Sequence, residues 1–498
     1  MRWLAPLLLL PPLTGCSGGA DSGARVDDDT GADTDTATPL PIATLGAADV
    51  RFVGAPSSAA GSAVAGPGDL DGDGRDDLVI SAFYASLACV AYAPLAPGAH
   101  PLADQACVRG SHPYDFVGYA VAGAGDVDDD GLPELLVSAL GHDEAGVEAG
   151  KVFLFTDPLP AGTTDADDAP VAFLGEALGD QAGARVAAAG NTAGDDVAAV
   201  LVGATGNDAG GGGGGRVYLL RGPFAPGVSS LGDAYATFTG AGAASSVRTH
   251  GESTGGDGLG DAIAAPGDLD GDGVDDLALG ASGADDGGAD SGAVWVLRGP
   301  VSAGDHDGSM ADARRVGPGN GAYAGGALAG GGDLDGDGLA DLLVAADGVS
   351  GGRIYVLLGP VSDGDAPLDD ALPALVGDAE GDLAGWSVAI TDDTDGDMLP
   401  DVLIGAPGSD AGGEDASDGG AVYLVTDAAT PGVRALGDAA RALFAAEAPG
   451  DAAGRAVSGA GDVDGDGVGD LLAGAQYNQA GGVFAGQAYL VLGASLPD

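Results

Sequence analysis

Six short segments of the sequence carry acidic residues at alternate positions around glycine. The first reads Asp69-Leu70-Asp71-Gly72-Asp73-Gly74-Arg75-Asp76-Asp77. Its first, third, fifth and ninth residues supply carboxylates, its sixth is a glycine that permits a sharp turn, and the main-chain carbonyl of the seventh, Arg75, adds another oxygen. Several hard oxygen donors in flexible geometry suit Ca²⁺, whereas Mg²⁺ prefers to keep water. The sequence therefore predicts a calcium site on this loop.

The same five positions recur in five further loops. In chain order the residues are Asp126, Asp128, Asp130, Leu132 and Glu134; Asp268, Asp270, Asp272, Val274 and Asp276; Asp333, Asp335, Asp337, Leu339 and Asp341; Asp393, Asp395, Asp397, Leu399 and Asp401; Asp462, Asp464, Asp466, Val468 and Asp470. Met398 replaces the turn glycine in one of these loops, so we expect weaker binding there. Without a cation each loop would crowd four like charges together, which argues against ordinary acidic turns.

An EF-hand loop begins in the same way but requires a bidentate glutamate at its twelfth position. Here that position is occupied by Ile80, Val137, Leu279, Val344, Ile404 or Ala473. Apolar residues at this point indicate a strand that is already entering a core. The loops are therefore predicted to be the tips of β-hairpins.

A seventh, degraded copy lies between the second and third acidic loops, where the spacing is about twice that of the other neighbours. Every copy has a glycine eight residues before the loop and an aliphatic residue five before it. These are Gly61, Gly118, Gly183, Gly260, Gly325, Gly385 and Gly454, and Val64, Val121, Val186, Ile263, Leu328, Val388 and Val457. The degraded loop places Asn191, Ala193, Asp195 and Ala199 at the ligand positions, so we predict that it binds no ion.

Each of the seven units reads as four strands. A short strand leads into the loop, an apolar run such as residues 78–80 leaves it, a third strand such as 294–297 carries large residues, and a weaker fourth follows. Four strands repeated seven times without helical periodicity are typical of a β-propeller. We therefore predict an all-β chain with one seven-bladed propeller over residues 46–498.

The two ends of the array predict how the ring closes. The last unit stops after its third strand, at residues 488–491, and residues 50–54 precede the first unit as an orphan strand. We expect the orphan to pair as the fourth strand of the last blade, because this would fasten the ring and remove an exposed sheet edge.

The N-terminus predicts export. Arg2 is followed by an apolar stretch from Leu4 to Leu13, too short to span a bilayer, and then by Thr14-Gly15-Cys16. This ending resembles the lipobox of bacterial lipoproteins, which implies a signal peptide over residues 1–15 and a lipid-modified Cys16. Ordinary secretory cleavage beside an incidental cysteine is the alternative. Residues 16–45 are rich in Ser, Gly, Ala, Asp and Thr without an apolar period, and they predict a flexible tether.

The two remaining cysteines, Cys89 and Cys107, lie in β-like runs on either side of a Pro/Gly-rich turn. An even pair in an oxidising compartment favours a disulfide, and adjacent antiparallel strands would bring the sulfurs within bonding distance. Two buried free thiols are the alternative.

Charge and composition exclude some functions. The chain has 76 acidic against 17 basic residues and a formal net charge of −59, so it repels nucleic acid and anionic lipid. We expect contact with a membrane only through the lipid anchor. No Ser-His-Asp or Cys-His arrangement stands out, and the five histidines lie in unrelated turns, which predicts a protein that is not an enzyme.

The unit from Phe116 to Gly131 resembles the FG-GAP repeat of the integrin α-subunit propeller, and Gly405-Ala406-Pro407 resembles its "GAP" element. The resemblance covers residues from about 50 to the C-terminus. It departs in the aromatic residue two positions before the glycine, found only as Phe116 and Tyr323, and in the degraded third loop. The resemblance implies calcium on one face and a ligand on the other, at the loops that join strands two and three, and four and one.

We therefore expect a monomeric, calcium-stabilised lipoprotein of the bacterial envelope, on the outer membrane or cell surface. It would act in adhesion or in recognition of an extracellular protein or glycan. Two alternatives remain: a propeller hydrolase or lyase that acts on glycans or esters, and a purely structural envelope protein.

Overall fold

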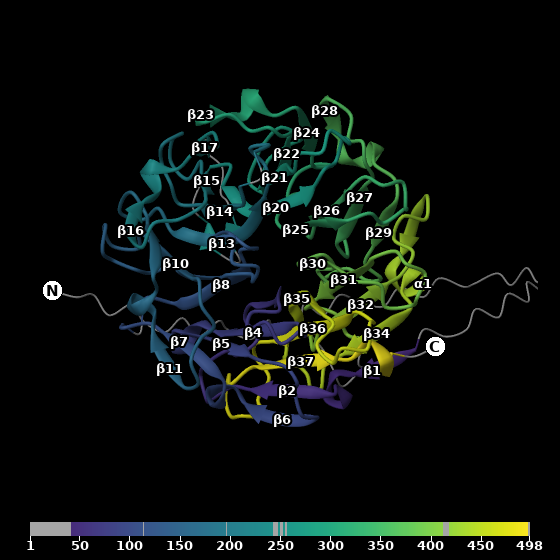
Figure 1. The fold of residues 1–498 in the computed structure, drawn as a ribbon. Helices are drawn as coiled ribbons and strands as arrows, with labels where there is room; N and C mark the ends of the chain where they lie inside the picture. Colours follow the sequence, from purple (N-terminus) through teal and green to yellow (C-terminus); the bar gives the residue numbers. More distant parts are fainter. Residues whose placement is uncertain are drawn as a thin grey trace, which may run out of the picture. The chain divides into compact units, whose positions relative to one another are not determined.

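The structure, a computed structural model, describes residues 41–112, 114–195, 197–242, 248–249, 252–253, 256–411 and 418–496. Within them, seven five-stranded sheets surround a central axis, and β18 (Arg248–Thr249) pairs with β19 (Glu252–Ser253) in a small ribbon (Figure 1). The predicted all-β, seven-bladed propeller is confirmed. The predicted signal peptide, Cys16 and the tether up to residue 40 lie outside the described residues.

Four strands of each blade run antiparallel from the axis outward. Blades one to four contain β3 (Val64–Gly68), β4 (Asp77–Ala82), β5 (Leu87–Ala91) and β7 (Ala106–Arg109); β8 (Val117–Gly123), β9 (Leu135–Ala139), β10 (Lys151–Phe155) and β12 (Val171–Leu174); β13 (Ala182–Gly190), β14 (Ala199–Ala204), β15 (Arg216–Arg221) and β17 (Ala236–Thr239); β20 (Leu259–Gly267), β21 (Asp276–Ala281), β22 (Ala293–Leu297) and β24 (Ala313–Val316). Blades five to seven contain β25 (Leu328–Gly332), β26 (Asp341–Ala346), β27 (Arg353–Leu357) and β29 (Ala374–Val376); β30 (Ser387–Thr391), β31 (Asp401–Ala406), β32 (Ala421–Val425) and β34 (Ala442–Ala445); β35 (Ala453–Gly461), β36 (Asp470–Ala475), β37 (Gln487–Val491) and β2 (Val50–Val53).

Each blade has a fifth, outermost strand that the sequence did not predict. In blade order these strands are β11 (Thr163–Asp165), β16 (Gly227–Ser230), β23 (Gly304–Asp307), β28 (Gly364–Pro367), β33 (Val433–Ala435), β1 (Ile42–Thr44) and β6 (Gly98–Pro101). Each pairs in parallel with the fourth strand of its blade, as β11 does with β7. All seven segments precede the fourth strand of the following blade, so they link neighbouring blades. They are three or four residues long and mostly exposed, and therefore carry no apolar signal.

Short 3₁₀ turns and one α-helical turn complete the described elements. They are η1 (Leu45–Ala47), η2 (Phe83–Ala85), η3 (Leu102–Asp104), η4 (Ala166–Asp168), η5 (Leu231–Asp233), η6 (Gly308–Met310), η7 (Leu368–Asp370), η8 (Gly493–Ser495) and α1 (Leu436–Ala439). Among the described residues there is no helix long and apolar enough to cross a bilayer.

The ring is closed by two strands from the start of the chain. β2 pairs antiparallel with β37, with Val50 opposite Leu490, which confirms the predicted exchange of the orphan strand. β1 adds a second closure, because it pairs in parallel with β34 of the sixth blade. Residues 42–44, at the end of the predicted tether, are therefore part of a sheet.

The hydrophobic core is divided into seven clusters, one between each pair of neighbouring blades. Between blades one and two, for example, Val79 and Val108 pack with Val117 and Phe153. The cluster that joins the last blade to the first contains Phe52, which is fully buried. Burial of apolar surface between blades therefore holds the ring together.

The glycine eight residues before each loop adopts a left-handed backbone in all seven blades, with φ between 76° and 95°. At Gly118 a Cβ atom would lie 2.8 Å from the Leu87 carbonyl oxygen and 2.7 Å from Ser81 Oγ. Glycine is needed there for both backbone conformation and close approach, which explains the strict register of the repeat.

Cys89 on β5 and Cys107 on β7 lie opposite each other in the antiparallel ladder. Their Cα atoms are 4.0 Å apart and their sulfurs are joined at 2.12 Å. The predicted disulfide therefore links the third and fourth strands of the first blade.

Candidate metal centres

The hairpin loops all lie on one face of the ring. Successive strands of a blade run in opposite directions, so the connection between strands one and two lies on one face, and the connections between two and three, and four and one, lie on the other. We call these the hairpin face and the opposite face.

In the first loop the main chain folds around the carboxylate of Asp69. Its Oδ1 accepts the N–H of Asp73 at 3.1 Å, and its Oδ2 accepts the N–H of Gly74 at 2.8 Å. Asp73 Oδ1 in turn accepts the N–H of Arg75 at 3.0 Å. Local hydrogen bonds therefore fix the carboxylates in place, which is the preorganisation that a metal site needs.

This arrangement is repeated in all six acidic loops. The carboxylate of the first loop residue accepts the N–H groups of the fourth and sixth residues at 2.6–2.9 Å every time. The residues at the sixth position have positive φ, and five of them are glycine. The spacing of Asp and Gly in the sequence thus encodes one loop conformation.

The ninth carboxylate is buried at the base of the loop. Asp77 is fully buried, and its two oxygens accept the N–H groups of Leu70 and Ala93, each at 2.9 Å. Equivalent pairs of bonds hold Asp276, Asp341 and Asp470. In the described structure Glu134 Oε1 and Asp401 Oδ1 are buried without a hydrogen-bond partner. A buried, unsatisfied carboxylate oxygen is costly, and a cation in the loop would compensate for it.

Burial raises the pKa of these ninth carboxyls, and the neighbouring loop carboxylates raise it further. The pKa is about 7 for Asp77, Glu134 and Asp470. It is about 6 for Asp276, Asp341 and Asp401. A bound divalent cation would oppose both effects by stabilising the ionised form.

The loops bring most of the predicted ligands together. In the second loop all four carboxylates, Asp126, Asp128, Asp130 and Glu134, offer oxygens within 4.8 Å of one another. In the first, fourth and fifth blades the first, third and ninth carboxylates meet this limit, and in the sixth blade the first, third and fifth do. This all-oxygen donor set, with a buried acid at its base, fits Ca²⁺.

Two loops depart from the pattern. In the sixth blade Met398 occupies the turn position with φ of 73°, yet its N–H still donates to Asp393 Oδ2 at 2.8 Å. The loop keeps its shape at the cost of backbone strain. In the third blade only Asp195 among the four ligand positions is acidic, and that loop does not fit a divalent ion.

The FG-GAP repeat model matches residues 256–297, 324–357 and 384–425, which lie in blades four, five and six. The chain contains FG-GAP repeats. Together with the seven blades, these matches show that it folds as an FG-GAP β-propeller.

Among solved structures, the chain is similar to one in the crystal structure of BBS1N in complex with ARL6DN, soaked with mercury. The sequences are 11% identical, 89% of this chain and 97% of that chain are covered, and the TM-score is 0.40. The corresponding crystal structure soaked with lead shows 12% identity, the same coverage and a TM-score of 0.42.

Neighbouring loops of the FG-GAP propeller touch one another. Leu132 packs over the first loop, where a Cβ on Gly72 would lie 3.2 Å from it. A main-chain N–H of the seventh loop, at Asp462, donates to Asp76 Oδ2 at 2.8 Å. The loop pattern in the sequence predicted no role for this eighth loop position. An acidic residue at the eighth position occurs in only some loops. Its presence is the sequence signal that could have indicated this contact between blades.

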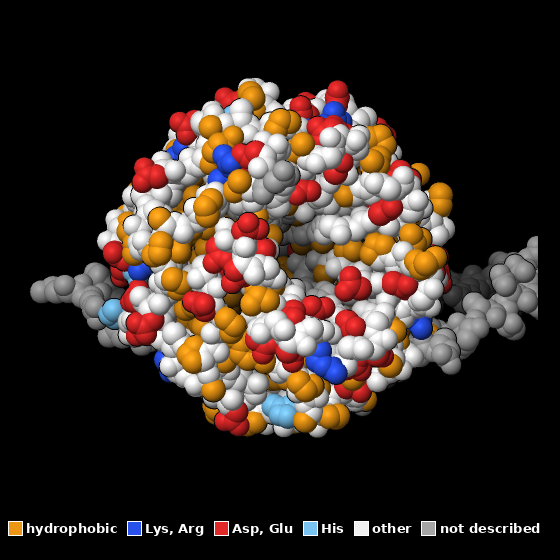
Figure 2. Space-filling model, in the orientation of Figure 1, with side chains coloured by type: hydrophobic (Ala, Val, Ile, Leu, Met, Phe, Trp, Pro, Cys, Tyr) orange, Lys and Arg blue, Asp and Glu red, His pale blue; other side chains and the backbone are white. Residues whose placement is uncertain are grey.

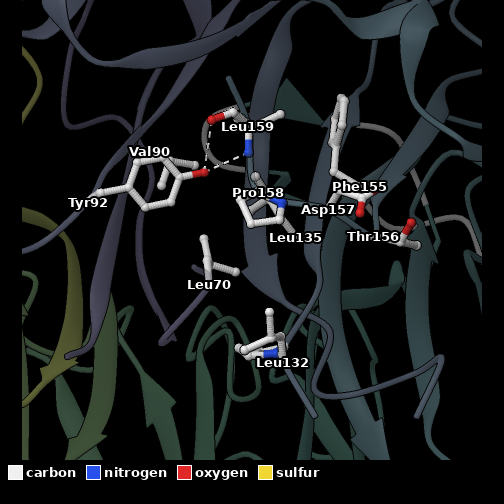
Figure 3. A pocket seen from close by; sticks show the side chains of 11 residues that line it. Leu70, Val90, Tyr92, Leu132, Leu135, Phe155, Thr156, Asp157, Pro158 and Leu159 are labelled. Carbon is white, nitrogen blue, oxygen red and sulfur yellow. Dashed lines mark hydrogen bonds between the residues drawn. The ribbon is translucent and has the colours of Figure 1, made fainter. Parts of the chain in front are cut away.

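The crevice beside these loops is a seam between the first and second blades (Figure 3). It is lined mainly by apolar side chains, including Leu70, Leu132 and Phe155. The hydroxyl of Tyr92 accepts the N–H of Leu159 at 2.6 Å and donates to the carbonyl of the same residue at 3.3 Å. Its polar group is thus used within the protein, so the crevice serves blade packing.

The opposite face carries aromatic side chains that the repeat does not dictate. Tyr84, Tyr114 and Phe484 are 53%, 77% and 52% exposed, and they lie in a loop of blade one, in the entry to blade two and in a loop of blade seven, respectively. Trp386 is half-buried, with the Arg455 guanidinium 4.8 Å from its ring centre. Because Arg455 belongs to the next blade, this contact supports packing between blades.

Acidic residues dominate the surface charge of the propeller. In the view of Figure 2 they are scattered over the whole face shown, and Lys and Arg are few. This agrees with the net charge of −59 and disfavours polyanionic partners.

Proposed function

We propose that this FG-GAP propeller is a calcium-stabilised recognition protein that binds an extracellular protein or glycan through its opposite face and catalyses no reaction. The supporting observation is the contrast between the faces. One repeats a single acidic loop, and the other presents varied loops with exposed aromatic rings.

Calcium would act at the hairpin tips. In each acidic loop the carboxylates at positions one, three, five and nine, with the main-chain carbonyl at position seven, would hold the ion, which supplies positive charge. The main-chain N–H groups described above orient the carboxylates, and the ninth ties the loop to the buried start of the second strand. Each site would therefore stabilise one blade.

Recognition is supported by Tyr84, Tyr114 and Phe484. Exposed aromatic rings provide large contact areas with little loss of conformational entropy, and they are enriched at binding interfaces. Single exposed apolar side chains are common on protein surfaces and need no functional explanation. Three exposed rings on adjacent blades of one face go beyond this and favour a binding site.

A catalytic role has less support. Asp261, on the innermost strand β20, is buried with a raised pKa of about 6, which is a feature of some catalytic acids. However, its Oδ2 accepts the hydroxyl of Ser282 at 2.6 Å, and Arg185 Nη2 lies 4.0 Å from its Oδ1. These groups pair with one another, which favours a structural role.

The location in the envelope is part of the same proposal. The lipobox-like sequence ending at Cys16 supports lipid anchoring, and the disulfide between Cys89 and Cys107 supports an oxidising compartment. Labelled palmitate should enter the wild-type protein in bacterial cells and not the Cys16→Ser variant. Equal labelling of the two would contradict the anchor.

The binding function can be tested on glycan and protein arrays. The mature chain with Cys16→Ser would be applied in calcium and then in EDTA, beside a triple variant, Tyr84→Ala, Tyr114→Ala and Phe484→Ala. A control triple variant, Val228→Ala, Met310→Ala and Val433→Ala, removes equally exposed apolar groups elsewhere. We expect a saturable ligand whose affinity falls at least about tenfold in the first variant only. A chain that binds nothing, or that cleaves the arrayed compounds, would contradict the proposal.

A further inference from the structure

The third hairpin loop, residues 191–199, keeps part of the common loop conformation although most ligands are gone. Asn191 Oδ1 accepts the N–H of Asp195 at 2.9 Å, as Asp69 Oδ1 accepts that of Asp73 in the first loop. A divalent cation would meet one carboxylate at the ligand positions instead of four. The loop therefore needs another source of positive charge if Asp195 is to be held in the same place.

Arg221 provides that charge. It is the last residue of β15 and lies directly opposite Ala199 in the ladder between β14 and β15. Its guanidinium forms an ion pair with Asp195, at the fifth loop position. The third blade has thus lost the ninth carboxylate and gained a cation on the strand opposite it.

The next blade shows that a guanidinium from this position reaches the ligands of the loop. Arg298 directly follows β22, as Arg221 ends β15, and its Nε lies 3.2 Å from Asp270 Oδ2, the third loop carboxylate. Its Nη1 also pairs with Asp363 at 2.6 Å. Because the fourth loop retains all four carboxylates, Arg298 is an addition to that site, whereas Arg221 meets a loop with a single charge.

Neighbouring groups hold Arg221 and its loop in position. The guanidinium carbon lies 5.0 Å from the ring centre of Tyr235, a favourable cation–π distance, and the Tyr235 hydroxyl donates to the Val301 carbonyl at 3.2 Å. The Arg221 side chain is 26% exposed, so its ion pair is partly shielded from water. Independently, the N–H of Asn191 donates to Asp275 Oδ2 of the fourth blade at 2.7 Å.

We propose that the Arg221 guanidinium takes the place of a metal ion in the third loop. One positive charge faces one carboxylate there, where a divalent ion would face four in the other loops. This hairpin tip is therefore independent of divalent ions. The contrast with the other six loops rests on their proposed calcium binding, but the role of Arg221 in its own loop does not.

Hydrogen exchange measured by mass spectrometry tests the proposal on the full mature protein. Exchange of peptides covering 191–199 and 268–276 would be compared in calcium and in EDTA, for wild type, Arg221→Gln and a control, Arg353→Gln, whose ion pair with Asp369 lies elsewhere. In wild type we expect EDTA to raise exchange at least about tenfold in 268–276 and to leave 191–199 unchanged. Arg221→Gln should raise exchange in 191–199 by a similar factor in calcium, and the control should not.

The outcomes separate the two proposals. If 191–199 exchanges equally in wild type and Arg221→Gln, or if EDTA opens it in wild type, the role of Arg221 is overturned. If EDTA changes neither loop while Arg221→Gln still opens 191–199, the role of Arg221 is supported and the calcium proposal fails.

A gain of binding provides a second test. The variant Asn191→Asp, Ala193→Asp and Ala199→Asp rebuilds the ligand set, and adding Arg221→Leu removes the internal cation. We expect one additional bound calcium per chain, measured by equilibrium dialysis, only when Arg221 is also replaced. An equally tight additional ion with Arg221 still present would show that the guanidinium does not occupy the place of the metal.

Discussion

The two faces of the propeller are made from the same strands but follow different rules. On the hairpin face, six loops share one hydrogen-bond pattern, with the first carboxylate bound to main-chain N–H groups at 2.6–2.9 Å. On the opposite face, the loop after β4 is the short turn η2 with Phe83 and Tyr84, whereas the loop after β14 is long and glycine-rich. The difference teaches that the stabilising loop is repeated around the ring, whereas the features suited to recognition occur in only some blades.

The largest expected loss of stability comes from a substitution in one acidic loop of the hairpin face. Asp268→Ala removes the carboxylate that organises the fourth loop, and with it a proposed ion. We expect a loss of about 3–5 kcal/mol, because an ion at a hundred times its dissociation constant contributes about 2.7 kcal/mol and the main-chain hydrogen bonds to the Asp268 carboxylate add to this. Asn191→Ala, at the same position of the third loop, should cost only about 1 kcal/mol. Thermal unfolding in calcium measures both, and equal losses would erase the distinction between these loops.

Asp261, a buried acid on the innermost strand β20, is expected to make the stability depend on pH. Its replacement should stabilise the protein, whereas Asp268→Ala should destabilise it. Burial raises the pKa of Asp261 to about 6, against about 3.9 in an unfolded chain. The folded state holds this proton more tightly, so stability falls as pH rises from about 4 to about 6 and then levels off. Asp261→Asn should remove the part of that slope that Asp261 contributes and stabilise the protein at pH 8 by up to about 3 kcal/mol. Denaturation across this pH range, with the exposed Asp233→Asn as control, checks it, and parallel curves for all three proteins would contradict it.

Within the hairpin face, the loop of the sixth blade differs from the other acidic loops because Met398 replaces the turn glycine. Relief of the backbone strain at Met398 tests this difference. Met398 has a left-handed backbone and is 89% exposed, so Met398→Gly loses little packing. We expect about 1 kcal/mol of added stability and tighter calcium binding at that loop. Met310→Gly, on the turn η6, should instead lower stability. Calorimetry would show whether each substitution raises or lowers the stability. A loss of stability at both positions would argue against backbone strain at Met398.

The smallest effect on stability is expected on the opposite face. Replacing Tyr84, Tyr114 or Phe484 individually by alanine should change the free energy of unfolding by less than about 1 kcal/mol, because the rings are half or more exposed. Urea titration would measure it. A loss of several kcal/mol would mean that these rings are structural, and the contrast between the faces would disappear.

Much of this structure follows from local sequence. The loop conformation is encoded by Asp and Gly within nine residues, and the register glycines and the orphan strand at residues 50–54 specify seven blades and their closure. The outer strands were missed because segments such as Thr163–Asp165 are short and polar and are stabilised by another blade. The pairing of Arg221 with Asp195 was missed because the two residues lie on different strands and meet only through the sheet register.

The central claim is that divalent cations hold the hairpin tips of this ring together. Thermal unfolding of the purified mature protein, with bound calcium measured on the same sample before and after EDTA, tests it most directly. The account predicts about six calcium ions per chain and a melting temperature that falls by about 10 °C or more when they are removed. A protein that binds no calcium, or that melts at the same temperature with and without it, would contradict the account.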